Sequence, residues 1–307
     1  MNVAETTTIG KSDPSSATGV TMNEGETLPF VAYTPESALR NPAKLVRELF
    51  AELWKSRELI WILFLRDLKA MYRLSYLGYA WIFVPPLATS AVWLFLNSQR
   101  IVQIAETPIP YSAFVLIGTM LWTTFSTALT QPLVSFTAGK PVFTKLKVPP
   151  DVFVIAGMAR VVFDLFVRLL LLLPLFIFLE MLPPPTAFLF PLNVVCLLLL
   201  ASALGMVLIP LGALYQDVGR AVTMSVGFVM YLAPVIYPPA KSGWSSTLIN
   251  WNPVTPIIMT GRDWLTVGHS DYFGPMLIVG GASLVVLFIA AVVLRVAMPH
   301  LVARMEN

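Results

Sequence analysis

Cysteine and histidine are nearly absent from this sequence, and charged residues are scarce. The single cysteine, Cys196, lies in an apolar run and has no second cysteine with which to form a disulfide. The two histidines, His269 and His300, are expected on opposite sides of a membrane, so they do not form a metal site together. These shortages exclude a thiolate redox centre and a histidine-rich metal site. We therefore expect this chain to bind no metal or cofactor of its own.

What the sequence has in excess is hydrophobic residues. Of its 307 residues, 57% are hydrophobic and only 12% are charged, and the mean hydropathy is +0.76. A soluble domain carries about 25% charged residues, so this composition is typical of a polytopic membrane protein. The net charge of +3 is too small to indicate nucleic-acid binding. Residues 1–28 lack an apolar core, so we expect no secretory signal peptide.

The first part of the chain has the composition of an aqueous segment. Residues 1–40 hold few apolar positions, and we expect them to form a disordered cytoplasmic tail. The fragment Gly10-Lys11-Ser12 is similar to the end of a phosphate-binding loop, but Glu5 stands where that loop needs glycine. A second Gly-Lys pair, Gly139-Lys140, also lacks the upstream glycine. The sequence therefore predicts no nucleotide site in this chain.

Residues 41–78 are expected to form an amphipathic helical region at the cytoplasmic face of the membrane. Leucines recur at four-residue intervals over 45–53, with charged residues on the other faces. The apolar run 59–65 that follows is far shorter than the ~20 residues that a spanning helix needs. This region either anchors the chain at the interface, with Trp54 and Trp61 at the headgroups, or docks a partner domain.

Six hydrophobic spans follow, and they predict an all-α polytopic membrane domain over 79–299 with a cytoplasmic C-terminus at 300–307. Lys and Arg concentrate in the loops that share a side with the N-terminus, so the positive-inside rule favours both termini in the cytoplasm. The predicted spans are 79–98, 111–134, 153–179, 187–213, 221–237 and 275–297.

Aromatic residues recur at helical spacing over 72–83, where the charged region meets the first span. A helix through this junction would stack them on one face. They are either an interfacial anchor or the cytoplasmic mouth of a conduit lined with aromatic rings. The candidate lining residues are Tyr72, Tyr76, Tyr79, Phe83, Trp122, Tyr231 and Tyr237.

Charged residues also occur inside the third predicted span. Arg160, Asp164 and Arg168 are spaced four residues apart, so a helix places them on one face. Charges at that depth are costly, and we expect them to face protein or water and to pair with one another. This ladder is either a structural ion-pair network or a stripe that faces a substrate.

The stretch between the fifth and sixth spans, 238–272, is not an ordinary loop. Its two half-apolar segments, Trp244–Trp251 and Pro256–Leu265, are split by Asn252-Pro253, and each is too short to span. Irregular structure at membrane depth is tolerated only where it is buried in protein or lines a watery cavity. We therefore predict a re-entrant helical hairpin that frames the external mouth.

Several of these segments together resemble one family. The region near the first span resembles the start of the membrane subunits of ABC-2 type exporters. It is most similar to the branch of that family that exports O-antigen, capsule and teichoic-acid polysaccharides. The matching residues are Arg66-Asp67, Tyr72-Arg73, Leu77-Gly78 and Pro85-Pro86. The stretch Asn252-Pro253-Val254-Thr255-Pro256-Ile257-Ile258 matches the family later in the chain. The resemblance extends over roughly residues 45–300.

The resemblance implies a transport subunit rather than an enzyme. Such subunits work as homodimers with two copies of a separate ABC nucleotide-binding subunit, which binds the ATP and Mg. The basic loop 139–151, which by composition is either a solvated loop or a rigid lever, matches the helix that couples to the ATPase. The candidate coupling residues are Arg66, Lys140, Lys145, Lys147 and Asp151. The implied external gate comprises Pro234, Trp244, Trp251, Asn252, Pro253, Pro256 and Arg262.

The expected function is ATP-driven export of a lipid-linked polysaccharide from the cytoplasmic side across a bacterial inner membrane. An ABC-2 exporter of a drug or a small lipid shares the fold and is the main alternative. A proton-coupled transporter is disfavoured because we find no internal repeat. An integral-membrane glycan-processing enzyme is disfavoured because the outer-loop carboxylates are scattered, at Glu106, Glu180, Asp263 and Asp271.

Overall fold

The computed structural model describes residues 51–72, 75–102, 104–143, 148–239 and 243–305. These residues belong to one compact unit that begins at Val46. Every regular element within the described ranges is helical, so the predicted all-α class is confirmed there. The predicted tail at 1–40 lies outside the described residues.

The helices differ widely in length, from a few residues to more than thirty. In chain order the α-helices are α3 (Arg57–Tyr72), α4 (Val84–Ser98), α5 (Tyr111–Phe143), α6 (Asp151–Leu169), α7 (Leu172–Phe178), α8 (Phe190–Leu214), α9 (Gln216–Val229), α10 (Trp244–Trp251), α11 (Val254–Thr266) and α12 (Phe273–Met305). Three 3-10 turns are η1 (Gly78–Ile82), η2 (Pro185–Leu189) and η3 (Met230–Leu232). Residues 51–55 are also helical.

Within the residues that the structure describes, four stretches are long and apolar enough to cross a membrane, and they coincide with the second, third, fourth and sixth predicted spans. Helices α4 and α9 lie at the other two predicted spans, but they have 15 and 14 residues, fewer than the ~20 that a perpendicular crossing needs. The stretch Asp151–Phe178 is interrupted by a turn at 170–171, between α6 and α7. The four membrane-length stretches are Tyr111–Val142, Asp151–Phe178, Pro185–Leu214 and Phe273–Met298.

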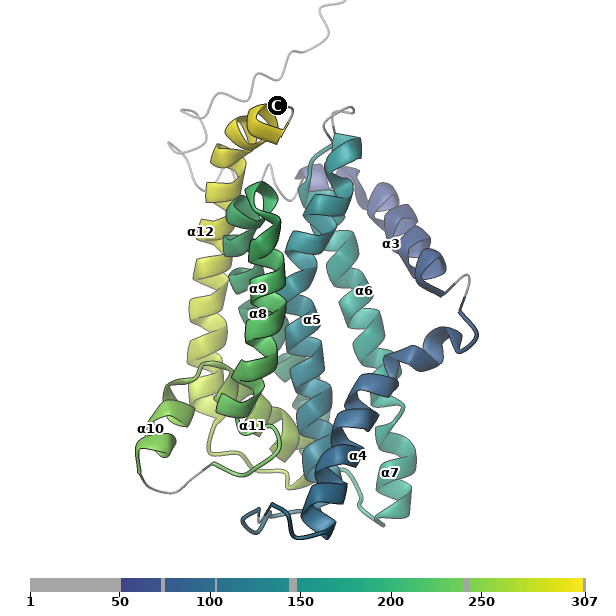
Figure 1. Ribbon diagram of the computed structural model, residues 1–307, viewed down its shortest axis with the longest axis vertical. Coiled ribbons are helices and arrows are strands. Elements are labelled where there is room, and N and C mark those ends of the chain that lie inside the picture. The colour runs from purple at the N-terminus through teal and green to yellow at the C-terminus, as the bar shows by residue number, and fades with distance from the viewer. Residues whose placement is uncertain (1–50, 73–74, 103, 144–147, 240–242, 306–307) are drawn as a thin grey trace, which may run out of the picture. The chain divides into compact units, whose positions relative to one another are not determined.

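Helix α5 is the centre of the bundle, with α6 on one side and α8 on the other (Figure 1). Most of its apolar side chains are buried, among them Phe114, Ile117 and Leu121. Threonines along α5 turn their hydroxyls back onto the helix, as when Thr124 donates to the carbonyl oxygen of Met120 at 2.9 Å. These polar side chains are therefore satisfied without solvent, which suits a helix surrounded by protein and lipid.

Helices α8 and α12 pack closely because small residues meet between them. A Cβ placed on Gly280 of α12 would lie 2.7 Å from Sγ of Cys196 on α8. Only a glycine tolerates so close an approach at this position. Cys196 is buried, as its apolar sequence context predicted, and it serves as a small core residue.

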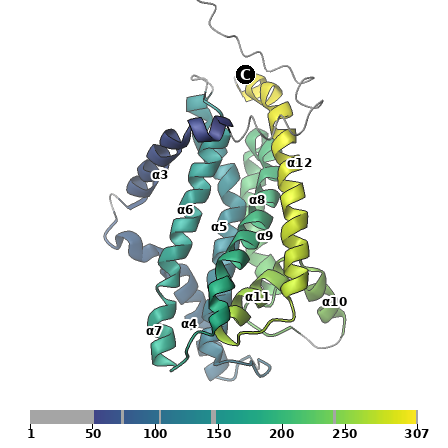
Figure 2. The ribbon, with the colours of Figure 1, turned by 180° about the vertical axis from the view of Figure 1, so that it is seen from behind.

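The connections between helices gather at two ends of the bundle (Figures 1 and 2). The end of α5, the beginning of α6, the start of α9 and the end of α12 share one end, which we call the C-terminal end. The α4–α5 connection, α7, α10 and α11 share the other, which we call the hairpin end. Helix α3 packs on the first turns of α6 through Leu63, which contacts the apolar cluster around Val152 and Ala156.

The predicted continuous helix through 72–83 is wrong. Helix α3 ends at Tyr72, and Gly78 adopts a φ of 51°, in the left-handed region. Glycine enters that region without steric cost, which lets the chain turn before η1 and α4 begin. The junction aromatics therefore do not share one α-helical face.

Candidate functional site

Arg262 on α11 is the most deeply buried charged residue among those described, with 1% of its surface exposed. Its Nη2 donates to the carbonyl oxygens of Pro234 and Val235, each at 2.9 Å. The guanidinium carbon lies 3.5 Å from the centre of the Phe114 ring on α5. One side chain therefore joins α11, the turn that follows η3, and the central helix. We call these four residues the arginine staple.

Among the residues that the structure describes, no carboxylate forms an ion pair with Arg262 of the arginine staple. Desolvation lowers the pKa of the Arg262 guanidinium to about 9, and the nearby charge of Asp263 opposes that shift. The group is still cationic at neutral pH, so carbonyl dipoles and the ring face of Phe114 are what stabilise it. A Cβ on Gly118 of α5 would lie 2.6 Å from Nη2, so glycine makes the space that the staple occupies.

Asparagines fix the rest of the hairpin end. Asn193 on α8 is buried, and its Nδ2 donates to the carbonyl oxygen of Ile257 on α11 at 2.6 Å. Asn252, between α10 and α11, donates to the carbonyl oxygen of Leu232 at 3.3 Å and accepts from the Val254 N–H at 3.0 Å. Asn193 therefore connects α11 to α8, and Asn252 connects the start of α11 to the turn after α9. In each case the side-chain amide forms hydrogen bonds with backbone atoms.

The predicted gate residues are divided by the structure. Pro234, Pro256 and Arg262 are buried together at the hairpin end, whereas Trp251 and Pro253 are exposed. The side chain of Trp244 lies outside the described residues. Sequence reasoning missed Asn193 and Gly118, which lie on other helices and gave no local signal.

The ladder on α6 points into the bundle. Asp164 and Arg168 are buried, and Arg168 donates from Nη1 to Oγ1 of Thr124 on α5 at 3.1 Å. Arg160 is less buried, and its Nε lies 4.0 Å from Oδ2 of Asp164. Within the described residues, Oδ1 of Asp164 has no hydrogen-bond partner. This arrangement places an anion between two cations at the middle of a membrane-length helix.

The C-terminal end holds a second set of charges. Nη2 of Arg295 on α12 lies 2.8 Å from Oε2 of Glu52 and 3.4 Å from Oδ2 of Asp151, the first residue of α6. Asp151, predicted to contact an ATPase, is therefore turned toward α12. We call these three residues the carboxylate clasp. The sequence analysis did not use Arg295 to predict this contact. A cation within an apolar run rarely occurs without a partner, so Arg295 itself was the available signal.

The structure describes two of the other predicted coupling residues. Lys140 lies in the last turns of α5, and Arg66 contacts the neighbouring Asp67 at 2.8 Å. Lys145 and Lys147 lie outside the described residues, so their role stays a prediction.

The aromatic residues assigned to a conduit are not brought together within one chain. Trp122 is 4% exposed and packs on Phe125 in the core, so within one chain it faces no conduit, and its assignment as a lining residue stays a prediction. Tyr76 is fully exposed, and Tyr79 packs edge-on against Phe163 of α6 with ring centres 6.1 Å apart. The backbone carbonyl of Tyr231 accepts a hydrogen bond from the Tyr237 hydroxyl.

The last two lining candidates, Phe83 and Tyr72, stay predictions. Phe83 is half-buried at the start of α4. The side chain of Tyr72 lies outside the described residues.

Over the part of the chain that the structure describes, no group of three or more His, Cys, Asp or Glu side chains is placed to hold a metal ion.

The chain belongs to the ABC-2 type transporter family, which it matches over residues 58–263. That range runs from α3 into α11, so it contains the ladder and the arginine staple but neither Arg295 nor Glu52. Membership implies a membrane transport subunit that works with a separate ABC ATPase.

Three curated relatives carry the same printed name, O-antigen export system permease protein RfbA. One from Klebsiella pneumoniae is 24% identical over 213 residues, which cover 67% of this chain and 80% of that protein. A second from the same species is 22% identical over the same shares. One from Myxococcus xanthus is 26% identical over 251 residues, which cover 79% of this chain and 94% of that protein.

Proposed function

We propose that this chain is the membrane subunit of an ATP-driven exporter that moves a lipid-linked, O-antigen-like polysaccharide from the cytoplasmic side across the bacterial inner membrane. The observation that carries the proposal is the family match over 58–263, which includes three of the four membrane-length stretches. The names of the curated relatives supply the class of substrate.

The proposed topology has six crossings, with both termini in the cytoplasm. Helices α4 and α9 would complete the count, each extended by an adjoining 3-10 turn, η1 and η3. The C-terminal end of the bundle is then cytoplasmic, as the distribution of Lys and Arg favours. Helices α10 and α11, with 8 and 13 residues, form the re-entrant hairpin, and the burial of α11 supports this placement.

Within this topology, two copies of the chain pair with two copies of the ATPase. The loop 139–151 and Arg66 would contact the ATPase. Because Asp151 belongs to the carboxylate clasp, movement of this loop would be passed through Arg295 to α12. Tyr79 and Phe83, beside the start of α4, are the residues we propose for contact with sugar rings. Aromatic faces suit a sliding polymer because they bind the apolar faces of sugars without fixing one position.

The runner-up function is export of a drug or a small lipid by the same kind of complex. The two functions differ in what accumulates inside a cell that lacks the chain. A lipid-linked glycan on the cytoplasmic leaflet supports the polysaccharide exporter, and its absence together with sensitivity to amphipathic drugs supports the alternative.

The first test is purification of the tagged chain from its native membrane in a mild detergent. We expect an ABC nucleotide-binding protein to co-purify in a one-to-one ratio, with ATPase activity. Recovery of the chain alone and without ATPase activity, in several mild detergents, would contradict the proposal.

A further inference from the structure

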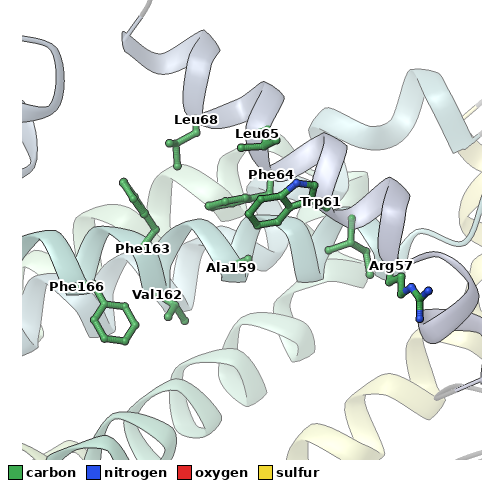
Figure 3. Close-up of a pocket in the computed structure, with 10 residues that line it drawn as sticks. Arg57, Trp61, Phe64, Leu65, Leu68, Ala159, Val162, Phe163 and Phe166 are labelled. Carbon is green, nitrogen blue, oxygen red and sulfur yellow. The ribbon is translucent and has the colours of Figure 1, made fainter.

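An open apolar groove of about 640 Å³ lies between α3 and α6 (Figure 3). Its volume is within the range of about 300–1,000 Å³ that is usual for sites of small molecules. Nearly all of its lining is hydrocarbon. The lining residues that matter here are Trp61, Phe64 and Leu68 on α3 and Ala159, Phe163 and Phe166 on α6.

The groove exists because α3 and α6 touch at one end and diverge toward the other (Figure 1). Near the first turns of α6, Leu63 of α3 packs in the cluster with Val152 and Ala156. Further along, Phe64 and Phe163 meet only edge to face, with ring centres 6.2 Å apart. Phe166 and Trp61 are left largely exposed on the two walls.

The two ends of the groove differ in polarity. Figure 3 shows Arg57 at one end and Phe166 at the other. The Arg57 guanidinium lies 5.2 Å from the centre of the Trp54 ring, and Trp54 and Trp61 are 71% and 60% exposed. Exposed tryptophans beside a cation are typical of the headgroup level of a bilayer. The groove is thus cationic at the headgroup level and apolar toward the membrane interior.

We propose that the groove binds an anionic phospholipid of the cytoplasmic leaflet. Its phosphate lies beside Arg57 and one acyl chain lies along Phe64, Phe163 and Phe166. A sugar does not fit this lining, because its hydroxyls would find almost no polar partner there. This inference rests on the cytoplasmic placement of the C-terminal end given above, but it does not depend on which substrate is exported.

A bound chain would have a mechanical effect, because it fills the space into which α3 would otherwise move. Without a bound chain, the apolar contacts described here between α3 and α6 are the small cluster around Leu63 and the edge-to-face pair of Phe64 and Phe163. A lipid in the groove therefore sets how firmly α3, the region proposed to lie at the cytoplasmic interface, is tied to the bundle.

The test uses the full-length chain, delipidated in detergent and titrated with defined lipids in native mass spectrometry. Dioleoylphosphatidylglycerol is the anionic probe, and dioleoylphosphatidylcholine has the same chains with no net charge. We expect one anionic lipid per chain to bind at least about fivefold more tightly than the neutral one, the effect of one basic residue near a lipid headgroup. Arg57→Gln should remove this preference, and Ala159→Trp, which fills the groove, should abolish tight binding of both lipids.

Ile278→Trp is the matched control, because Ile278 is an exposed apolar residue on α12, away from the groove. It should bind lipid as the wild type does. Equal binding of both lipids by the wild type, or unchanged binding in Ala159→Trp, overturns the proposal. A shift from dimer to monomer in Ala159→Trp also overturns it, because the groove would then be covered by a second copy. Neither export nor ATPase recovery enters this measurement, so its failure leaves the proposed function standing.

Discussion

Arg295 and Glu52 are 243 residues apart in the chain, yet Nη2 of Arg295 lies 2.8 Å from Oε2 of Glu52. The same nitrogen lies 3.4 Å from Oδ2 of Asp151. Glu52 precedes α3, Asp151 begins α6 and Arg295 belongs to α12, so one guanidinium connects three elements. All three side chains are partly buried, which reduces the screening that weakens surface ion pairs.

Arg295→Ala should therefore lower stability more than loss of an exposed pair does. We expect a decrease of about 1–2 kcal/mol in the free energy of unfolding, because two carboxylates lose a shared cation. Arg220→Ala is the control, since Arg220 pairs with Asp217 at 3.4 Å on an exposed surface and should cost less than about 0.5 kcal/mol. Thermal unfolding in detergent measures both, and equal effects would contradict the clasp.

Gly118→Ala should disturb the arginine staple without touching its charge. The added methyl group would lie 2.6 Å from Nη2 of Arg262 and against the backbone of Val235, and backbone gives way at a cost of about 1–3 kcal/mol. Gly281→Ala is the comparison, because a Cβ on that helical residue meets nothing within 4 Å. The comparison variant should be neutral or more stable by up to about 1 kcal/mol. If Gly118→Ala and Gly281→Ala are equally stable, the arginine staple does not restrict the space at Gly118.

Asp164→Asn should remove the anionic partner of Arg160 and the negative charge next to Arg168 in the ladder. We expect a loss of about 3 kcal/mol, since a buried charge that loses its partner is strongly destabilising. The double variant Asp164→Asn with Arg168→Gln should recover part of that loss, because it also removes one of the buried cations that the carboxylate balances. Strictly additive effects of the two substitutions would show that the residues do not act as a pair.

Replacing Tyr79 and Phe83 together by alanine should slow export by about two- to tenfold, the effect of losing aromatic contacts worth about 0.5–1.5 kcal/mol. Dimer assembly should be unchanged, as judged by size-exclusion chromatography. A normal export rate would mean that these rings do not contact the moving polymer.

Lys145→Glu should weaken recovery of the ATPase by about tenfold, because a reversed charge at a polar interface repels the partner. Lys11→Glu makes the same charge change in the predicted tail and should leave recovery unaltered. The measurement is co-purification from the native membrane, and undiminished recovery with normal transport would remove Lys145 from the coupling surface.

Local periodicity predicted some of these features well. The four-residue spacing of Arg160, Asp164 and Arg168 placed them on one face of α6, and the apolar runs located four membrane-length stretches close to their observed positions. Such features depend on neighbours within a few turns of one helix. The same period failed between Tyr72, where α3 ends, and Gly78, whose positive φ lies at the start of η1.

Contacts between distant segments could not be predicted in the same way. Nothing in the sequence near Arg262 indicates that its guanidinium meets carbonyls of Pro234 and Val235, because backbone acceptors have no residue-type signal. Trp122 was assigned to a lining because it is aromatic, but its position on the innermost face of α5 depends on how the whole bundle packs. These relationships follow from tertiary packing rather than from any local pattern.

The close contact between Cys196 and Gly280 has a practical consequence for measuring movement in this protein. Because its one natural thiol is enclosed between α8 and α12, thiol-reactive probes should label a cysteine introduced at an exposed site in preference to it. Pairs of spin labels or fluorophores on α3 and α12 can then report distances through a transport cycle in an otherwise unaltered chain.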